Sequence, residues 1–417
     1  MEARYDLVIV GGGLVGATLA LTLLPTVRQY GLSLAMVEPA PWGGQAYQPS
    51  FDARSTALSH SSRQLFEVIG VWSELVQRVT PIHHIHVSDQ GFPGVTRMEA
   101  AQEQVPALGY VAENAWLGQS LYLALSRAEE LAILSPAQVE AIKPVGQGMQ
   151  LTLLQNNEPR VVQAALILMA DGGRSGLTDG LGMTSRTTAY QQRAVIANVI
   201  ASQDHGNVAY ERFSRQGPMA LLPLNERPGQ PSRRFAVVYI QSEQESADSL
   251  LQDDAAFLRA IQGRMGFRAG RFVHCGHRDL YPLYKREALE TVRQGLALVG
   301  NSAHAMHPVA GQGFNLALRG VARLVQAINK GLDKGIGLGD LAMLDSYAQA
   351  QRQDQQRVMR YMDLGLKTFA NGHFASGVVR NAALLALDLM GPLKTGFVKR
   401  ATGVGAMPAL DEIGYVS

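Results

Sequence analysis

A strand followed by three regularly spaced glycines near the amino terminus places the strongest constraint on how this chain folds. Leu7–Val10 is an apolar run typical of a buried parallel strand, and Gly11, Gly13 and Gly16 follow it in a G-x-G-x-x-G spacing. The first glycine permits a tight turn, the second lets a pyrophosphate approach the backbone, and the third lets helix and strand pack closely. The pattern predicts a helix over residues 14–27 whose N-terminus binds a dinucleotide phosphate.

An acidic residue after the next apolar run narrows the identity of that dinucleotide. Residues 32–37 predict a second strand, and Glu38 follows it about 20 residues beyond the glycines. A carboxylate there hydrogen-bonds a ribose hydroxyl and disfavours a 2′-phosphate. The sequence therefore predicts FAD or NAD rather than NADP. The glycine pattern alone leaves the choice between those two open, and it also leaves open a chance cluster of glycines.

Two later strand-like runs each end in a turn that carries a polar side chain. Residues 166–170 lead into Asp171, and residues 296–299 lead into Gly300 and Asn301. Asn301 can accept a hydrogen bond from a hydroxyl as an aspartate would, but it does so without a charge. Together with the first glycine motif, these segments favour a flavin over a nicotinamide as the bound cofactor.

A second glycine-marked helix start follows these turns. The segment from His304 to Asn315 precedes a helical stretch over residues 316–330. The dipole of such a helix can stabilise negative charge on the N1–C2=O edge of a reduced flavin. His304 and His307 are three residues apart, but Pro308 breaks any helix that would orient them and no third ligand lies at a recognised spacing. We therefore expect no metal here, and we interpret the histidines as shaping the loop.

In this order and over this distance, the three segments resemble those of the aromatic-ring hydroxylases that hold FAD, the group typified by para-hydroxybenzoate hydroxylase. Residues 211–213 with 217–223 are similar to a signature of the ubiquinone-biosynthesis hydroxylases within that group, and the resemblance runs through most of the chain. Asn301 replaces the usual aspartate of the family, and Thr178 stands where many relatives carry a basic residue. The resemblance implies that FAD is bound by Gly11, Gly13, Gly16, Glu38, Arg54, Gln119, Val139, Asp171, Gly300, Asn301, Gly311, Gly313, Phe314 and Asn315. It places the catalytic loop at Pro308, Gly311, Gln312 and Gly313.

The expected fold is α/β. It comprises a Rossmann-like FAD-binding domain of the glutathione-reductase type, an inserted β-sheet substrate domain and a C-terminal helical segment. The cofactor domain is expected over residues 1–78, 100–180 and 285–335, the substrate domain over 79–99 and 181–284, and the helical region over 336–417. Alternating β-branched stretches predict the strands of the substrate sheet at residues 82–88, 194–201, 208–213, 219–223 and 235–241.

The activity implied by the resemblance is that of a flavoprotein monooxygenase. NAD(P)H reduces the flavin, the reduced flavin captures O2 as a C4a-hydroperoxide, and an electron-rich phenol attacks the distal oxygen. The expected substrate is a polyprenylated phenol of ubiquinone biosynthesis, 2-octaprenyl-6-methoxyphenol, with a paralogous ring position as the alternative. Only one dinucleotide fingerprint is visible, so NAD(P)H is expected to bind transiently. The base that would deprotonate the phenol is not identified, and His304, His307 and Tyr281 are equal candidates.

Other classes of protein share parts of this pattern. A flavin-dependent isoprenoid reductase shares the fold, and a non-catalytic member of a quinone-synthesis complex would keep the fold without the flavin. A flavin halogenase is disfavoured because the three tryptophans form no W-x-W-x-I-P segment. Of the histidines at residues 83, 84 and 86, strand alternation puts only His84 and His86 on one face, and two histidines make an incomplete metal site, so an ordinary strand position is the preferred interpretation.

Charge and composition bear on location and partners. The net charge of +2 with no strong basic block argues against nucleic acid, and the single Cys275 excludes an internal disulfide and fits a reducing compartment. We expect no signal peptide and no apolar run long enough to span a membrane, and hence a cytoplasmic enzyme. Residues 378–400 mix apolar and basic side chains, so they could contact an anionic membrane surface or pack as a core or subunit-contact helix. Homo-oligomerisation and contact with other ubiquinone-biosynthesis proteins remain open.

Overall fold

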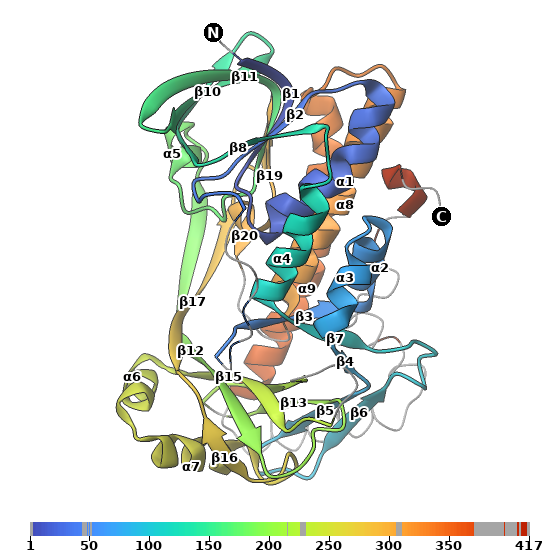
Figure 1. Ribbon diagram of the computed structural model, residues 1–417. Coiled ribbons are helices and arrows are strands. Elements are labelled where there is room, and N and C mark those ends of the chain that lie inside the picture. Colours follow the sequence, from blue (N-terminus) through green and yellow to red (C-terminus); the bar gives the residue numbers. More distant parts are fainter. Residues whose placement is uncertain are drawn as a thin grey trace.

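The protein has two large β-sheets at opposite ends, which are joined by long strands and flanked by helices (Figure 1). The computed structural model describes residues 3–43, 48, 50, 52–214, 216–225, 231–305, 311–370, 396, 407 and 410–414. Within these residues, a small three-stranded sheet lies between the two large ones, and helices α8 and α9 run alongside (Figure 1).

The first large sheet has eight strands and a parallel core in the order β19-β11-β1-β2-β8. Along β1, Leu7 and Ile9 pack against the helices, whereas Val8 and Val10 pack against the antiparallel strands β9 and β10. The sheet is therefore buried on both faces, which explains the unbroken apolar runs in its strands. Its strands are β1 (Ala3–Val10), β2 (Leu34–Val37), β8 (Leu131–Leu134), β9 (Ala137–Val145), β10 (Gly148–Gln155), β11 (Glu158–Met169), β18 (Val292–Arg293) and β19 (Leu296–Leu298).

The helices around this sheet begin where the glycine motifs predict. Helix α1 begins at Leu14 as expected, but it continues past Pro25 to Tyr30 and ends at Gly31, which adopts a left-handed conformation. This longer helix displaces the next strand to residues 34–37, two residues later than expected. The other helices on this side are α2 (His60–Val68), α3 (Trp72–Leu75), η1 (Val76–Arg78), α4 (Asn114–Leu125) and α5 (Leu177–Gly180).

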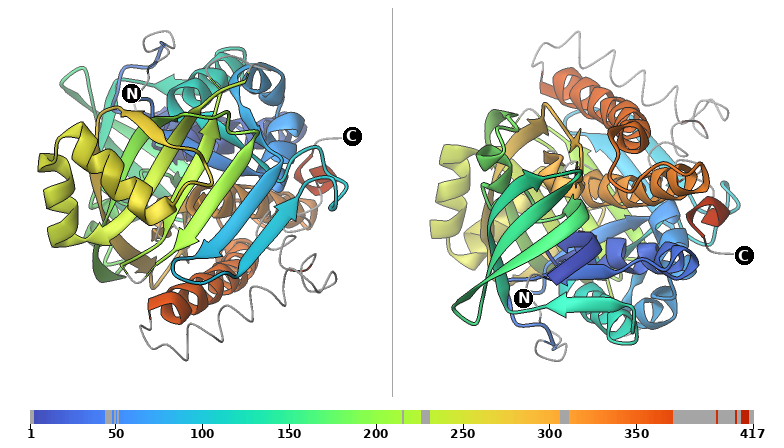
Figure 2. Two further views of the ribbon diagram at one scale, coloured as in Figure 1. Left: turned by 90° about the horizontal axis from the view of Figure 1, so that it is seen from below. Right: turned by 90° about the horizontal axis from the view of Figure 1, so that it is seen from above.

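The second large sheet has nine strands and carries two helices on one face. Helices α6 (Glu243–Leu251) and α7 (Asp254–Met265) lie across its outer face (Figure 2, left), so its inner face is turned toward the rest of the molecule. Eight strands follow the order β20-β17-β12-β15-β14-β13-β5-β6, and β16 pairs with β12. Their bounds are β5 (His84–Asp89), β6 (Val95–Glu99), β12 (Ser185–Ala201), β13 (Val208–Phe213), β14 (Met219–Leu224), β15 (Arg234–Ser242), β16 (Phe272–Cys275), β17 (Asp279–Ala288) and β20 (His304–Ala305).

The strand expected over residues 82–88 is instead two strands in different sheets. Residues 80–82 form β4 in the three-stranded sheet, and β5 begins at His84 in the nine-stranded sheet. Between them the His83 N–H donates to the carbonyl of Asn207, which turns the chain from one sheet to the other. The three-stranded sheet comprises β3 (Ser55–Ser59), β4 (Thr80–Ile82) and β7 (Gly109–Glu113).

Two long helices complete the described structure. Helix α8 (Gln312–Asp333) begins four residues earlier than expected, and α9 (Leu341–Ala370) packs against it. The helical region predicted beyond residue 370 lies mostly outside the described residues. Two short helical turns are η2 (Gly300–Ser302) and η4 (Leu410–Ile413). None of the described helices is long and apolar enough to cross a membrane.

Candidate functional site

The candidate cofactor site lies at the edge of the first sheet where the parallel strands end. The Gly11 N–H donates to the Val37 carbonyl at 2.9 Å, and the Ala170 N–H donates to the Val10 carbonyl at 2.8 Å. Because parallel strands present their carboxyl ends at one edge, the turns after β1, β2, β11 and β19 meet there. The segments that sequence reasoning assigned to one cofactor are therefore brought together.

The three glycines of the first turn meet different structural demands. Gly11 has φ +102°, and a Cβ added there would lie 2.8 Å from the Ala170 carbonyl oxygen. A Cβ on Gly16 would overlap the carbonyl oxygen of Gly11. Gly13 has an ordinary φ of −64°, and its Cβ would have no protein atom within 4 Å. Neither backbone nor packing requires glycine at position 13, whereas a pyrophosphate lying against the helix N-terminus would require it.

The acidic residue after β2 is held facing the glycine turn. One carboxylate oxygen of Glu38 accepts the Gly12 N–H at 2.7 Å, and the other accepts the Ala40 N–H at 2.9 Å. Each carboxylate oxygen can accept two hydrogen bonds, so capacity remains for a ribose hydroxyl. The Glu38 carbonyl accepts the Ala137 N–H at 2.9 Å, which places the start of β9 and its buried Val139 beside the end of β2.

Asp171 joins the turn after β11 to the turn after β19. Its carboxylate accepts the Ser302 hydroxyl at 2.6 Å and the Gly173 N–H at 2.9 Å, and it also bonds the Ser175 hydroxyl. Burial alone would raise the pKa of Asp171, but the hydrogen bonds from Ser175, Ser302 and the backbone hold that pKa below its ordinary value. Asp171 is thus ionised at neutral pH and fixes the relative position of the two turns.

The turn after β19 packs tightly but presents a polar side chain outward. Gly300 has φ +61°, and a Cβ there would lie 3.2 Å from Val15 and 3.5 Å from Ala317. The turn therefore sits against the starts of α1 and α8. Asn301 is exposed, so its carboxamide is accessible to a ribityl hydroxyl.

The N-terminus of α8 is fixed by a buried amide. The Asn315 side chain donates to the carbonyls of Ala57 and Gly311 at 2.9 and 3.0 Å. It accepts the Ser59 N–H at 2.8 Å and the Ser62 hydroxyl at 2.7 Å. Two donors and two acceptors satisfy the amide, so its side chain holds the helix end in place, and contact with a flavin would fall to main-chain atoms.

The first turn of α8 can receive the flavin expected there. The N–H groups of Gly313 and Phe314 lie beyond the internal hydrogen-bond ladder of the helix. A Cβ on Gly313 would meet no atom of the described residues within 4 Å, as at Gly13. Gln312 is partly accessible at the start of the same turn. Pro308 and His307, within residues 306–310, lie outside the described residues.

Two further predicted flavin contacts lie on the flanks of this region. Arg54 is exposed, donates to the Tyr281 hydroxyl at 2.8 Å and lies 5.7 Å from the centre of that ring. Gln119 is partly buried on α4, beside Gly118, whose Cβ would lie 3.8 Å from Leu14 at the start of α1. Arg54 therefore links the cofactor side to β17 of the second sheet.

The two described candidates for the base differ in environment. His304 is 2% exposed, and its ring nitrogens have no hydrogen-bond partner among the described residues. Burial, with help from Arg319 and against the effect of Asp354, lowers the pKa of His304 to about 4, so the ring is neutral at physiological pH. The Tyr281 hydroxyl accepts the hydrogen bond from Arg54.

The described residues contain no group of three or more metal-ligating side chains.

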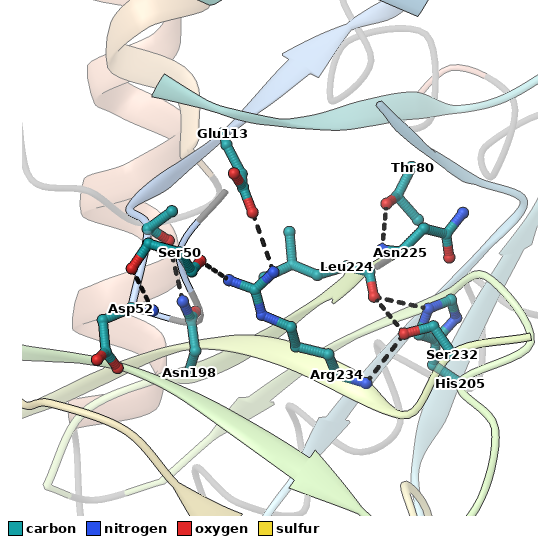
Figure 3. Close-up of polar contacts among 11 residues, drawn as sticks. Ser50, Asp52, Thr80, Glu113, Asn198, His205, Leu224, Asn225, Ser232 and Arg234 are labelled. Atoms are coloured by element: carbon teal, nitrogen blue, oxygen red, sulfur yellow. Dashed lines mark hydrogen bonds and ion pairs between the residues drawn. The ribbon is translucent and has the colours of Figure 1, made fainter. Parts of the chain in front are cut away.

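The nine-stranded sheet meets the rest of the molecule through buried polar contacts (Figure 3). We call that other part the cofactor half, because it contains the candidate cofactor site. Arg234 of β15 donates to the Glu113 carboxylate at 3.0 Å and to the Ser50 carbonyl at 2.8 Å. The Asn198 side chain of β12 donates to the carbonyl of Ala53 at 2.9 Å. These contacts hold the inner face of the sheet against the segment that contains Arg54.

Accessible side chains gather in the middle of that inner face. Val195, Leu221 and Val237 pack against Phe257 of α7, so alternate residues of the same strands point to the inner face. Most inner-face residues of the central strands are buried. Several are partly accessible, and five of these form what we call the inner-face patch: Ile196, Glu211, Ala220, Leu222 and Val238.

Sequence reasoning placed the strands of the patch but did not single out its residues. Glu211 appeared only as part of a family signature. The signal that could have found it is the alternation of Ala209, Glu211 and Phe213, which puts one carboxylate between two apolar side chains on the same face.

Comparison with known proteins identifies the family. The chain matches the FAD binding domain family over residues 4–362. It is 33% identical over 402 residues to the ubiquinone hydroxylase UbiL of Rhodospirillum rubrum, covering 95% of this chain and 89% of that protein. It is 30% identical over 407 residues to the 3-demethoxyubiquinol 3-hydroxylase of Escherichia coli, covering 96% of this chain and 98% of that protein.

A solved structure agrees in fold. The p-nitrophenol 4-monooxygenase PnpA of Pseudomonas putida superimposes with a TM-score of 0.77 at 17% identity, covering 96% of this chain and 99% of that chain. The predicted fold class and the predicted FAD cofactor are confirmed. The chain therefore belongs to the family of FAD-dependent monooxygenases that includes the hydroxylases of ubiquinone biosynthesis.

Proposed function

We propose that this protein hydroxylates a polyprenylated phenol of ubiquinone biosynthesis, 2-octaprenyl-6-methoxyphenol, using O2 and NAD(P)H. The observation that carries the proposal is the inner-face patch, a largely apolar and partly accessible surface on the sheet that faces the cofactor half. A prenylated ring suits such a surface because burying apolar area is favourable. The ubiquinone hydroxylases among the relatives support the pathway.

The proposed arrangement has three parts. The cofactor domain comprises residues 1–78, 100–180 and 285–335, the substrate domain residues 79–99 and 181–284, and the helical region residues 336–417. Gly13 and the α8 N-terminus at Gly313 would receive the pyrophosphate and the flavin ring, because both leave room where a side chain would stand. Glu38 would bind ribose, and Asn301 the ribityl chain.

The chemistry divides between the cofactor and the protein. FAD, when bound, supplies the redox chemistry that activates O2 for transfer to the ring. The protein would orient the phenol over the flavin, keep water away through the apolar patch, and stabilise negative charge at the start of α8. Arg54 and Tyr281 would close the space between the two halves. NAD(P)H is proposed as a transient reductant.

The substrate also bears on where the protein works. A polyprenyl chain partitions into lipid, so we propose that the enzyme takes its substrate at a membrane surface, alone or with other proteins of the pathway. The segment proposed for that contact, residues 378–400, lies almost entirely outside the described residues.

A paralogous ring position is the second candidate. The relative from Escherichia coli is named as a 3-hydroxylase of demethoxyubiquinol, and its alignment spans nearly the whole of both chains. The apolar patch would accept either ring, so it does not favour one ring carbon.

The test uses the purified flavin-loaded protein with 2-octaprenyl-6-methoxyphenol in detergent micelles, NADH or NADPH, and isotopically labelled O2. We expect phenol-dependent O2 consumption and a product carrying one labelled oxygen by mass spectrometry. Deleting the gene in its host should cause the same phenol to accumulate. Accumulation of a different quinone precursor would move the assignment to the paralogous reaction, and a lack of phenol-dependent O2 uptake would contradict the proposed activity.

A further inference from the structure

Glu211 points toward the cofactor half of the molecule. Its strand neighbour Arg212 turns to the outer face, where its guanidinium donates to the Met265 carbonyl of α7 at 3.0 Å. Strand alternation therefore directs Glu211 to the inner face, with Ala209 and Phe213 on either side. Both of those residues are buried, whereas Glu211 keeps accessible surface.

The position of Glu211 can be related to the start of α8 through a short series of contacts. A Cβ on Gly311, the N-cap residue of α8, would lie 3.3 Å from Ala57 of β3. Ala57 pairs with Val111 of β7, and Val111 packs in one apolar cluster with Ala209. Glu211 is the next residue after Ala209 on the same face of β13. It thus belongs to the layer between the second sheet and the expected flavin site.

The immediate surroundings of Glu211 are apolar. Its partners across the ladder are Ala220 on β14 and Val87 on β5. Within the described part of the chain, the Glu211 side chain takes part in no hydrogen bond or ion pair. This burial, with no compensating charge, raises the pKa of Glu211 to about 7.

Two buried carboxylates among the described residues are paired with arginines, which makes Glu211 different from them. Glu113 is paired with Arg234 at 3.0 Å, and Asp354 is paired with Arg319 at 2.7 Å. A carboxylate without a partner on an apolar face costs stability, and ionisable groups placed in this way are often found where a protein binds or reacts with a ligand.

Few other ionisable groups face Glu211 from the segments that the structure describes. On the adjacent strands the inner face carries Asp89, which is buried at the end of β5. Across from the sheet, Glu113 is held by Arg234, and Arg54 bonds Tyr281. None of these groups contributes to the shift of the Glu211 pKa, which arises from burial.

We propose that Glu211 is a catalytic residue that accepts the hydroxyl proton of the phenol, an assignment that rests on the proposed function. In this step the phenol O–H bond breaks and an O–H bond forms on the carboxylate. The electron pair left on the phenol oxygen delocalises into the ring, whose ortho and para carbons become better nucleophiles toward the activated oxygen. The hydroxylated ring carbon loses its hydrogen as a proton to solvent, and Glu211 returns its own proton to the phenol oxygen as the ring becomes aromatic again. His304 and Tyr281 are less suited, because the first is fully buried and the second is engaged by Arg54.

The test compares Glu211→Gln, Glu211→Asp and the control Glu99→Gln in the full-length flavin-loaded protein, with a short-chain 2-prenyl-6-methoxyphenol as substrate. Glu99 is partly accessible on β6 of the same sheet but on the outer face, because its neighbour Met98 packs inward. We expect the wild-type kcat to rise as pH increases through about 7, where Glu211 becomes ionised. Glu211→Gln should lose this pH limb and lower kcat by about 100- to 10,000-fold, with a smaller change in KM and full flavin content.

Two further results separate a base from a structural residue. Glu211→Asp should restore part of kcat together with the pH limb. A ring-fluorinated analogue whose hydroxyl is already ionised at the assay pH should lose much less activity in Glu211→Gln. A Glu211→Gln enzyme with wild-type kcat and an unchanged pH profile would overturn the assignment while leaving the proposed function intact. A wild-type enzyme that oxygenates none of these phenols would overturn both.

Discussion

At the scale of single residues, glycines in this protein are required for different reasons. Gly11 and Gly16 are demanded by the protein itself, because a side chain would collide with neighbouring backbone. Gly13 and Gly313 have no such neighbour among the described residues, and a Cβ there would enter open space at a helix N-terminus. The dinucleotide is the only partner in the proposed site that explains glycine at position 13.

Replacing Gly13 with valine should therefore abolish flavin retention without unfolding the protein. The branched side chain would occupy the space that the pyrophosphate needs, while φ at this position suits any residue. Flavin absorbance per mole of purified protein measures the effect, and circular dichroism checks the fold. Gly263→Val on α7 is the matched control, since its Cβ also meets no protein atom and lies far from the motif. A Gly13→Val protein with stoichiometric flavin would refute this placement of the pyrophosphate.

At the scale of elements, α8 and α9 are joined by a buried charge cluster. The Asp354 carboxylate on α9 lies 2.7 Å from Arg319 and 2.6 Å from Arg323 on α8. Burial opposes ionisation of Asp354, but the two arginines outweigh it and lower its pKa. The start of α8 is also held by Asn315, so the helix proposed to face the flavin is anchored along its length.

Asp354→Asn should lower the free energy of unfolding by about 3–5 kcal/mol, because it removes the carboxylate that the buried guanidinium of Arg319 contacts. The pKa of Asp354 is lower in the folded than in the unfolded state, so its contribution is present above the ordinary carboxyl pKa and is lost as pH falls through the folded value. Urea denaturation at neutral and acidic pH should show wild type and variant converging in acid. Asp345→Asn, on an exposed position of α9, should match wild type throughout. Equal stability of Asp354→Asn and wild type at neutral pH would contradict this account.

At the scale of the whole molecule, polar contacts over an apolar layer join the nine-stranded sheet to the cofactor half. Arg234 and Glu113 form the ion pair of this junction, and both are largely buried (Figure 3). Ala209, Leu224 and Val111 pack beside them in one cluster. The pair therefore links β15 of the nine-stranded sheet to β7 of the three-stranded sheet.

Arg234→Met should destabilise the protein by about 3–5 kcal/mol, because Glu113 would remain charged and buried without its partner. The double variant Arg234→Met with Glu113→Leu should recover much of that loss, since an apolar pair of similar volume removes the uncompensated charge. Chemical denaturation followed by flavin fluorescence measures both. Losses that simply add in the double variant would show that the two side chains are not coupled.

The sequence by itself determined the cofactor class, the family and most of the elements that form the cofactor site. Those features depend on local spacing: a glycine turn, an apolar strand and a helix start are neighbours in the chain, so their geometry follows from a few consecutive residues. The boundaries were less certain, as at Pro25, which the packed helix α1 tolerates, and at His83, where the chain changes sheets.

Only the tertiary structure decided which distant residues meet. The satisfied amide of Asn315, the burial of His304 and the unpaired Glu211 depend on strand order, register and helix packing between segments far apart in the chain. The sequence shows only a glutamate at each position. It does not show that an arginine faces Glu113 or that only apolar side chains face Glu211. The difference lies in the desolvation and charge of its neighbours, and long-range folding alone supplies those neighbours.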